Sequence, residues 1–441
     1  MHRFAEKQLV MWKNDPSLKP LIVRGARQVG KSYLIDQFGS KNFKSFITIN
    51  FEFERKFLSC FDELDPVKII SKITLLKGES ITPGKTLLFL DEIQECPQAI
   101  LALRYFKEQM PNLHIIAAGS LLEFTLNNAD FRMPVGRVQS LYVKPLSFLE
   151  YLHASGMEKM AEYINEVDIN DTILPAVHDA LIEKLREYFI IGGMPEVVAH
   201  YLQHHDLHKV QVLQATLLEY YRKDFGKYDV KVKLRYLQEV FDKAPFIIAQ
   251  NFKFVNINPD ILSRDLRPAL SAIVDAGLVY EVFRSNAAGL PLSATTNYKK
   301  FKLLLLDIGL VQSACDTNTT DFLSKEMHHL NRGALAEQFV GQEILAYADN
   351  YKKQCLYYWE RGRKSSTAEV DYLYSHNAVI YPIEVKSGTT GRLKSLHIFL
   401  DEKKLEVGIR ISERQLNFEN RVLSVPFYMV SQLPRLLQLI N

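Results

Sequence analysis

Short apolar runs separated by longer stretches of mixed polarity mark the first third of the chain. Residues 86–90 form an unbroken apolar run, the pattern of a strand buried on both faces of a parallel sheet, and residues 21–23 and 114–118 are similar. Residues 46–50 also read as a strand, whereas residues 66–76 place apolar side chains at helical spacing. The alternation of strand-like and helix-like segments predicts an α/β core built on a parallel sheet.

A glycine-containing string, GARQVGKS, follows the first strand-like run and precedes a helix-like stretch. This strand-loop-helix context is typical of a phosphate-binding P-loop, and it disfavours a chance match in a turn. Lys31 is expected to contact the β- and γ-phosphates, while Ser32 offers a hydroxyl to magnesium. The following helix adds its unpaired N–H groups. The residues predicted to contact the nucleotide are Gly25, Ala26, Arg27, Gln28, Val29, Gly30, Lys31, Ser32 and Tyr33.

Two acidic residues, Asp91 and Glu92, end the apolar run 86–90. Ligands of open α/β sheets bind at the carboxyl ends of the strands, so both side chains are expected at the nucleotide. Asp91 is predicted to hold magnesium through water and Glu92 to polarise the attacking water. An acidic turn at a strand end is the alternative, and the P-loop upstream disfavours it.

The third apolar run, 114–118, ends in Gly119 and Ser120. Ser120 is expected beside the strand that carries Asp91, where it would sense the γ-phosphate. A serine after a strand is also a common turn former, and both interpretations stay open.

Taken together, GARQVGKS, LLFLDEIQ and AAGS resemble the AAA+ superfamily of P-loop ATPases. The segments LLFLDEIQECP, GSLLEF and GRVQSLYVKPLSFLEYL resemble a prokaryotic branch of it, and the match extends to about residue 225. The resemblance implies ATP and Mg²⁺ as ligands, an ATPase core over 1–145 and a helical lid over 146–225. It also implies an arginine that completes the site from the same chain or from a neighbour in a homo-oligomer. Arg137, in the context VGRV, fits this role better than Arg132.

Composition bounds the remaining possibilities. The chain has 441 residues, enough for about three domains, and 47% of them are apolar. A net charge of +3 neither requires nor excludes a nucleic-acid partner. The four cysteines show no C-x-x-C spacing, which argues against a zinc site or a disulfide framework. Without a signal-like start or a run of roughly 18 apolar residues, we expect a cytoplasmic protein that does not associate with membranes.

The middle of the chain, residues 226–320, has the order helix, helix, hairpin that is typical of a winged helix-turn-helix. Helical spacing from residue 234 and a second helix over 264–276 precede strand-like runs at 278–283 and 298–306. Basic residues could contact phosphate, but interleaved acids leave a solvated face or a protein-docking role open. These candidates are Arg222, Lys223, Lys227, Lys231, Lys233, Arg235, Arg264, Arg267, Lys299, Lys300 and Lys302.

The last 120 residues carry a second constellation of polar side chains. A helical stripe over 333–347 precedes strand-like pieces, and the last of them holds Glu384 and Lys386. Residues two apart on a strand share a face, so these two side chains point the same way, and Asp371 on the preceding strand can lie beside them. Two carboxylates and an ammonium could hold a divalent cation and activate water.

The segments EVDYLY and YPIEVKSG resemble the PD-(D/E)XK nuclease superfamily. The resemblance implies a small α/β nuclease-like domain over 321–441, with Asp371 and Glu384 as metal ligands, Glu337 as a helical contributor and Lys386 as a catalytic residue. A polar sheet face is the alternative, and a fold can outlive its chemistry. A loop with Arg361, Arg363 and Lys364 could lie along a phosphate backbone or be a plain surface loop.

The predicted fold is therefore a P-loop NTPase parallel sheet with a helical lid, followed by a winged helix-turn-helix and a small nuclease-like α/β domain. The predicted function is ATP hydrolysis by a protein that acts on or with nucleic acid, DNA or RNA. One alternative is a nucleotide-dependent switch that binds a protein partner and cuts nothing. Another is an accessory ATPase of transposition or defence.

Overall fold

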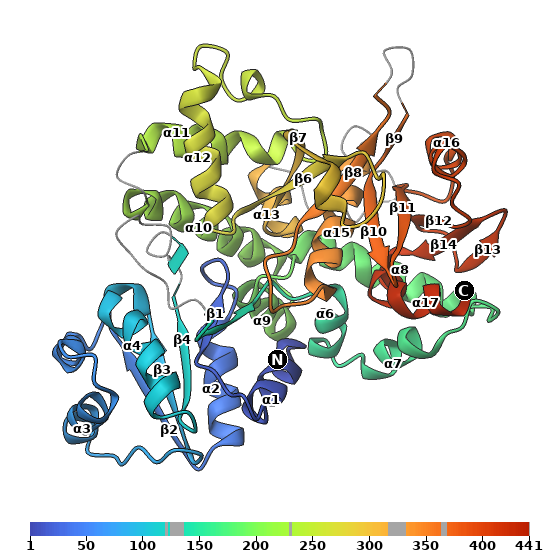
Figure 1. The fold of residues 1–441 in the computed structure, drawn as a ribbon. Helices are drawn as coiled ribbons and strands as arrows, with labels where there is room; N and C mark the ends of the chain where they lie inside the picture. Colours follow the sequence, from blue (N-terminus) through green and yellow to red (C-terminus); the bar gives the residue numbers. More distant parts are fainter. Residues whose placement is uncertain (120–121, 124–135, 229–231, 316–331, 363–367, 441) are drawn as a thin grey trace.

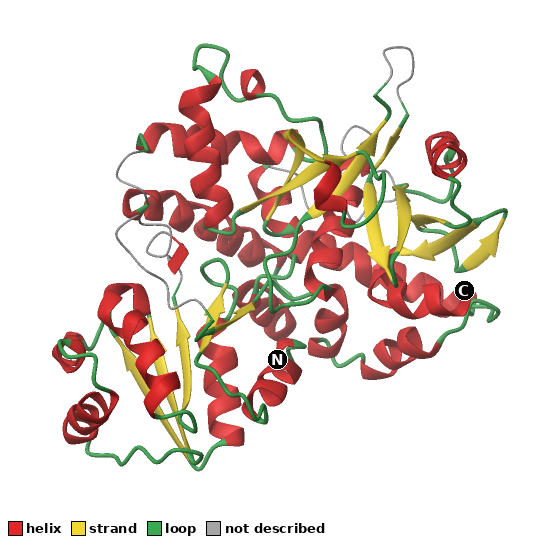
Figure 2. Ribbon diagram, in the orientation of Figure 1, coloured by secondary structure: helices red, strands yellow, loops and turns green. Residues whose placement is uncertain are grey.

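A computed structural model describes residues 1–119, 122–123, 136–228, 232–315, 332–362 and 368–440 (Figure 1). In Figure 2 one sheet lies at the lower left and the other strands at the upper right, with helices between them. Among the described residues, no helix combines the length and the apolar content that crossing a bilayer requires.

The N-terminal sheet consists of five parallel strands in the order β2-β3-β4-β1-β5. The strands predicted over 21–23, 46–50, 86–90 and 114–118 are confirmed. The elements of this region are α1 (Ala5–Lys13), β1 (Leu21–Arg24), α2 (Lys31–Asn42), β2 (Ser45–Asn50), α3 (Pro66–Lys77), β3 (Thr86–Asp91), α4 (Pro97–Gln109), β4 (His114–Ala118) and β5 (Gln139–Tyr142).

Strand β3 is apolar without interruption because both faces of the sheet are covered. Leu87 and Phe89 join the core that includes α2, whereas Leu88 and Leu90 join the core that includes α3 and α4. Successive side chains of a strand point to opposite faces, so one strand supplies both cores. Its carboxyl end therefore emerges between the two helical layers, at the edge where Asp91 lies.

A helical region follows, with a break where the sequence places two glycines and a proline. A Cβ at Gly192, where φ is 72°, would lie 2.1 Å from Oδ1 of Asp307, so only glycine fits there. The helices are α6 (Phe148–Ala154), α7 (Glu158–Glu166), α8 (Pro175–Ile191), α9 (Pro195–His204) and α10 (Leu207–Asp224). Helix α13 (Ile308–Ala314), which comes much later in the chain, packs on α8 and α10.

The middle of the chain has the predicted order of two helices and a hairpin. Helix α11 (Leu234–Lys243) packs on α12 (Ser263–Asp275), and β6 (Val279–Ser285) pairs in antiparallel fashion with β7 (Thr296–Leu305). The hairpin does not end the sheet, because β8 (Leu356–Glu360) pairs in parallel with β6 and β9 (Glu369–Val370) adds a fourth strand. The regions predicted as winged helix and nuclease-like domain thus share one sheet, β7-β6-β8-β9.

The C-terminal region adds a second five-stranded sheet, in the order β10-β11-β12-β14-β13. The predicted helical stripe and the strand-like pieces that follow it are present. Its other elements are α15 (Arg332–Tyr347), β10 (Tyr372–His376), β11 (Val379–Val385), α16 (Lys394–Lys403), β12 (Gly408–Ser412), β13 (Asn417–Glu419), β14 (Val422–Pro426) and α17 (Leu433–Ile440). Short 3₁₀ helices along the chain are η1 (Arg55–Phe61), η2 (Ile93–Glu95), η3 (Phe225–Lys227), η4 (Ala244–Ile247), η5 (Phe254–Asn256), η6 (Leu292–Thr295) and η7 (Phe427–Gln432).

Candidate functional site

The loop of residues 25–30 links the carboxyl end of β1 to the N-terminus of α2. Its two glycines are required by geometry. Gly25 and Gly30 have φ values of 145° and 85°, and a Cβ at Gly25 would lie 2.3 Å from the carbonyl oxygen of Val143. The loop therefore takes a path that side chains would block, and it leaves the N–H groups of the first turn of α2 for an anion.

Lys31 is held inside this loop by backbone carbonyls. Its side chain is buried, and its Nζ donates to the oxygens of Gly25 and Ala26 at 3.0 and 2.8 Å. Burial lowers the pKa of Lys31 to about 8, although the charges of Glu92 and Asp91 oppose the shift. An ammonium donates to carbonyl and to phosphate oxygens alike, so phosphate oxygens can replace these two carbonyls as its acceptors.

Asp91 lies at the centre of a small polar group at the ends of β2 and β3. One of its oxygens, Oδ2, accepts from Ser32 Oγ at 3.1 Å and from Asn50 Nδ2 at 3.2 Å. Burial, aided by the charge of Glu92, raises the pKa of Asp91. A hydroxyl and a carboxylate in contact at a P-loop are the donor set that Mg²⁺ prefers, so these residues fit the predicted ion.

Asn50 was not among the predicted site residues. It ends β2 and lies directly opposite Asp91 in the parallel register. Asn50 is the polar residue at the end of the strand-like run 46–50. Its position beside Asp91 follows only from the pairing of β2 with β3.

Glu92 has a left-handed backbone conformation, with φ of 49°. Its Oε2 accepts from Gln94 Nε2 at 2.6 Å. A Cβ at Gly119, at the end of β4, would lie 2.1 Å from Gln94 Oε1. Gln94 thus fills the space between the Glu92 carboxylate and the end of β4. Gln94 was not among the predicted site residues. The left-handed backbone conformation of Glu92 is strained because Glu92 is not a glycine, and such strain is common at active sites.

Segments far away in the sequence cover the outer side of the P-loop. Arg27 forms an ion pair with Asp224 at the end of α10, and the hydroxyl of Tyr221 donates to the Arg27 carbonyl at 3.0 Å. The turn between α12 and β6 also lies against the loop, since a Cβ at Gly277 would be 3.4 Å from the amide nitrogen of Ala26. The nucleotide loop is therefore in contact with both the helical region and the middle of the chain.

Two further residues predicted for the nucleotide site, Arg137 and Tyr33, contact other parts of the chain. Arg137 precedes β5 at the edge of the sheet opposite the P-loop, where its Nε donates to Glu108 at 2.9 Å. Tyr33 is half-exposed, and its hydroxyl accepts from the N-terminal amine at 3.2 Å. Ser120 and Arg132 lie outside the described residues.

The polar residues predicted in the C-terminal region lie close together, but with an unpredicted member. The Nζ of Lys302, on β7, lies 3.1 Å from Glu337, 2.5 Å from Glu369 and 3.9 Å from Asp371. We call these four residues and Glu384 the carboxylate cluster. Burial raises the pKa of Glu337 to about 8, and the charge of Asp371 adds to the shift.

The predicted metal ligands of this cluster have protein partners. Val385 N donates to Asp371 at 2.7 Å, and Lys386 Nζ donates to Glu384 at 2.6 Å. Within the described ranges, no three acidic, histidine or cysteine side chains form a group that could hold a metal ion. The residues as placed do not fit a metal site, and Glu337 in particular contacts Lys302 instead.

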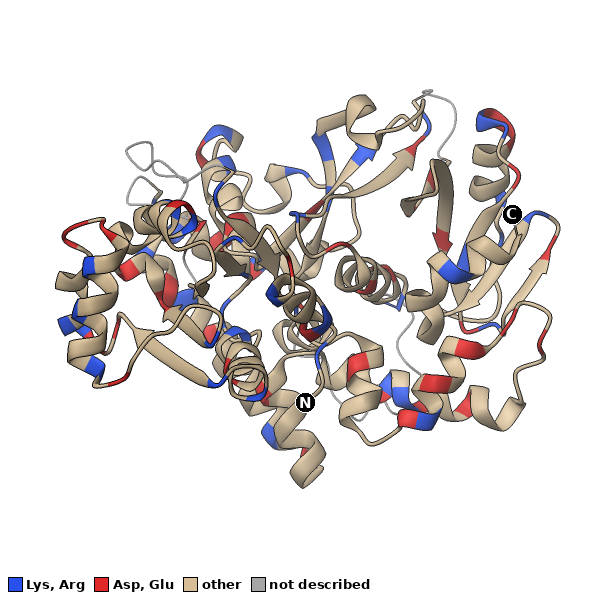
Figure 3. Cartoon of the chain, turned by 60° about the horizontal axis from the view of Figure 1, so that its bottom comes forward, with Lys and Arg blue, Asp and Glu red and all other residues tan. Residues whose placement is uncertain are grey.

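Some of the basic residues predicted to contact phosphate are exposed, whereas others are buried or paired with acidic residues. The prediction is wrong for Lys302, whose side chain is 2% exposed. Arg264 at the start of α12 is 80% exposed and Lys300 is half-exposed, although Lys300 also contacts Glu360. In Figure 3 basic and acidic residues are interleaved along the elements. Five more basic candidates have acidic partners, namely Arg222 with Asp242, Lys223 with Glu219, Lys227 with Glu52, Arg267 with Glu281 and Arg361 with Glu402. Lys231, Arg363 and Lys364 lie outside the described residues.

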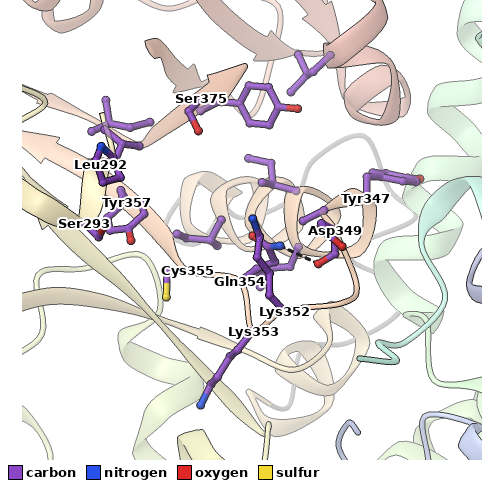
Figure 4. Close-up of a pocket in the computed structure, with 18 of the residues that line it drawn as sticks. Leu292, Ser293, Tyr347, Asp349, Lys352, Lys353, Gln354, Cys355, Tyr357 and Ser375 are labelled. Atoms are coloured by element: carbon purple, nitrogen blue, oxygen red, sulfur yellow. Dashed lines mark hydrogen bonds between the residues drawn. The ribbon is translucent and has the colours of Figure 1, made fainter. Parts of the chain in front are cut away.

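A cavity of about 950 Å³ opens at the C-terminal end of α15, where it meets the start of β8 (Figure 4). Its lining includes Tyr347, Lys352 and Tyr357, and Gln354 Nε2 donates to the Asp349 carbonyl at 2.7 Å. No residue of the P-loop or of the carboxylate cluster lines it. No sequence motif predicted this cavity, because its lining comes from segments far apart in the chain.

The solved structures that match this chain share little sequence with it. The Walker-type ATPase PABY2304 of Pyrococcus abyssi is 16% identical over 71% of this chain and 95% of its own, with a TM-score of 0.45. The ORC1 protein of Aeropyrum pernix in complex with DNA is 10% identical over 74% of this chain and 95% of its own, with a TM-score of 0.29. These likenesses are too low to carry an argument about function. No curated protein matches the chain significantly.

Three family models match consecutive parts of the chain. Residues 182–321 and 332–428 match two domains of unknown function, DUF8612 and DUF4143. Residues 17–152 match the family described as AAA domain, and this range includes the P-loop, Asp91 and Glu92. The amino-terminal region of this chain is therefore an AAA-type P-loop ATPase domain.

Proposed function

We propose that this chain hydrolyses ATP at the loop of residues 25–32. The contact of Ser32 Oγ with Asp91 Oδ2, at 3.1 Å beside the buried Lys31, is the observation that carries the proposal. The phosphates would replace the carbonyls of Gly25 and Ala26 as partners of the Lys31 ammonium. Ser32 and Asp91 would hold Mg²⁺, which when bound neutralises charge on the phosphate oxygens.

Glu92 is the proposed general base of this reaction. Gln94 orients it by donating to Oε2, and the Glu92 carboxylate would accept a proton from the attacking water. Glu92→Gln should lower the hydrolysis rate by about 100-fold or more, because general-base catalysis contributes roughly that factor, while ATP binding persists. Glu95→Gln, a change three residues further along the chain at a residue paired with Arg55, is the matched control. Hydrolysis that survives in Glu92→Gln would refute the assignment.

Arg137 is proposed to serve the nucleotide site of a neighbouring copy. Its place at the sheet edge opposite the P-loop supports action between chains over action within one chain. Arg137→Ala and Glu92→Gln proteins, each inactive alone, should recover activity when mixed, because an intact P-loop would then meet an intact arginine. A mixture as inactive as its parts argues against this role.

The middle of the chain is proposed to contact nucleic acid. Its helix-helix-hairpin order and the exposed Arg264 at the start of α12 support this role. Duplex DNA, single-stranded DNA or RNA should raise the ATPase rate, and binding should weaken with added salt. Arg264→Glu should weaken binding, whereas Arg104→Glu, an exposed change on α4, should not. Equal binding by both variants would contradict the proposal.

A second candidate is a nucleotide-dependent switch with a C-terminal region that cuts nothing. The ammonium of Lys302 among the predicted metal ligands favours this candidate. It predicts that the purified chain leaves DNA and RNA intact in Mg²⁺ or Mn²⁺, with and without ATP. Cleavage that disappears in Asp371→Asn would restore the nuclease.

A further inference from the structure

Strands β8 and β10 separate beside the cavity at the C-terminal end of α15. Where β8 pairs with β9, Trp359 lies opposite Val370. If this antiparallel register continued, Leu356 would lie opposite Leu373. Among the described residues, however, β10 pairs with β11 alone, and β8 pairs with β6 and β9. The two strands therefore part after β9, and no strand pairing joins them along the cavity.

The cavity runs along the edges of these strands. Its lining takes consecutive residues, 354–357 from β8 and the residues before it, and 373–375 from β10. Successive side chains of a strand point to opposite faces, so a space that touches consecutive residues lies beside the strand, where backbone N–H and C=O groups point. In Figure 4 Tyr357 and Ser375 lie on separate strands at the border of the cavity.

The other edge of each strand is already paired. Residues 356–358 of β8 pair with β6, and β10 pairs with β11 along its whole length. The two edges that flank the cavity therefore have no strand partner among the described residues. Unpaired strand edges are where an extended peptide can bind, because its main chain adds hydrogen bonds as a further strand would.

The charged residues of the lining favour an acidic occupant. They are Asp349, Lys352 and Lys353. Asp349 accepts from the Tyr351 amide at 2.9 Å, and Lys353 contacts Asp275 at 3.4 Å. Lys352 is exposed and forms no ion pair within the described ranges. The lining thus carries one positive charge in excess, and Lys352 is placed to meet a carboxylate.

Most of the remaining lining is apolar. Leu292 of η6, Ile344 of α15 and Leu433 of α17 contribute to it. Because alternate side chains of an extended segment point to opposite sides, such a segment can place apolar side chains on these residues and acidic side chains toward the lysines.

We propose that this cavity binds an extended acidic segment of a partner protein, which adds as a strand beside β10 and places a carboxylate at Lys352. The pattern it recognises alternates acidic and apolar residues. The proposal concerns this cavity alone, so it can fail while ATP hydrolysis at residues 25–32 stands. It supplies a docking surface for the switch described above.

The test uses fluorescent libraries of short peptides and the full, nucleotide-free chain, with fluorescence polarisation as the readout. In the first library Glu alternates with Val, Leu or Phe. In the second, Lys replaces Glu. The third keeps the first composition but is N-methylated at alternate amides, which removes backbone donors. The first library should bind about tenfold or more tightly than the other two. No binding of the first library, or equal binding of all three, overturns the proposal.

Two variants place the binding at this cavity. Lys352→Glu reverses a charge at the exposed rim, and Ser293→Trp fills the cavity from an exposed position, so both should fold and both should weaken binding about tenfold. Lys394→Glu, a charge reversal at an exposed position of α16 that does not line the cavity, is the matched control and should bind as the unchanged chain does. Equal binding by all three variants contradicts the proposal.

Cys355 gives a readout on the unchanged chain, because it lines the cavity and is exposed. Bound peptide should slow the alkylation of Cys355 by iodoacetamide, measured by mass spectrometry, and should leave Cys315, which does not line this cavity, unaffected. Alkylation of Cys355 that bound peptide does not slow overturns the proposal. Protection of Cys355 that increases with protein concentration alone would identify a second copy of this chain as the occupant and also overturn it.

Discussion

Burial of charged side chains dominates the chemistry of single residues in this protein. Glu343, fully inside the molecule, accepts from the Phe148 amide at 3.1 and 3.2 Å, and burial raises its pKa to about 8. Asp307 accepts from Gly193 N at 2.6 Å, and burial raises its pKa to about 6. Both carboxylates cap helix or loop amides, and they do so at an electrostatic cost that depends on pH.

Glu343→Gln should change how stability depends on pH. The folded pKa lies above the ordinary value of 4.5, so the folded state binds more protons between about pH 4.5 and 8, and stability falls as pH rises through this window. Relative to Glu343→Gln, the unchanged chain should lose about 3 to 5 kcal/mol of unfolding free energy across it, at about 1.4 kcal/mol per pKa unit. Denaturant titrations at several pH values measure this. Glu196→Gln, an exposed control, should run parallel to the unchanged chain.

The buried ammonium of Lys31 should make ATP binding depend on pH. Its pKa of about 8 in the nucleotide-free protein should rise when phosphate oxygens replace the loop carbonyls. ATP binding should therefore take up protons near pH 8, and affinity should fall as pH rises above it. Calorimetry in buffers of different ionisation enthalpy measures this uptake. An unchanged uptake in Lys31→Met would show that another group is responsible.

At the scale of elements, the P-loop and β3 were predictable because each has a local signature. Burial on both faces explains why β3 is apolar throughout. The two glycines explain the path of the P-loop backbone. The pairing of β8 with β6 was not predictable, because a parallel partner in another region leaves no mark in either strand. The same holds for η2, whose Gln94 joins Glu92 to the end of β4.

Gly119→Ala tests this contact between η2 and β4. The new Cβ would lie 2.1 Å from Gln94 Oε1, so the flexible Gln94 side chain must move and release Glu92. ATP turnover should fall about tenfold with little change in ATP affinity, and Gln94→Ala should do the same. Because both changes break one contact, the double variant should be no worse than either single one. Additive losses in turnover would mean that Gln94 does not act through Glu92.

At the scale of the whole molecule, regions later in the chain contact the P-loop and also contribute to the carboxylate cluster. Helix α10 reaches Arg27 through Asp224, and the α12–β6 turn lies on Ala26. Strand β6 begins after that turn and forms a hairpin with β7, which carries Lys302. Nucleotide loop and cluster are therefore joined by one hairpin, a physical route by which one site can bias the other.

The Arg27–Asp224 pair should be energetically significant because Asp224 is buried. A double-mutant cycle with Arg27→Met and Asp224→Asn should give a coupling of at least about 1 kcal/mol in unfolding free energy. The exposed pair Arg55–Glu95, treated in the same way, should give a coupling near the lower end of about 0.2–1 kcal/mol. Similar couplings for the two pairs would show that α10 is not held to the loop by this contact.

The sequence by itself determined the P-loop, the two acids at the end of β3 and the order of the elements, because each depends on residues that are neighbours in the chain. The apolar run 86–90, for example, needs only its own composition to predict a buried strand. The tertiary structure decided which distant residues complete each site: Asn50 beside Asp91, Asp224 beside Arg27 and Lys302 among the predicted metal ligands. A lysine in a strand pattern reads as exposed, and only the packing of the hairpin on the C-terminal region buries it against carboxylates that stabilise its charge.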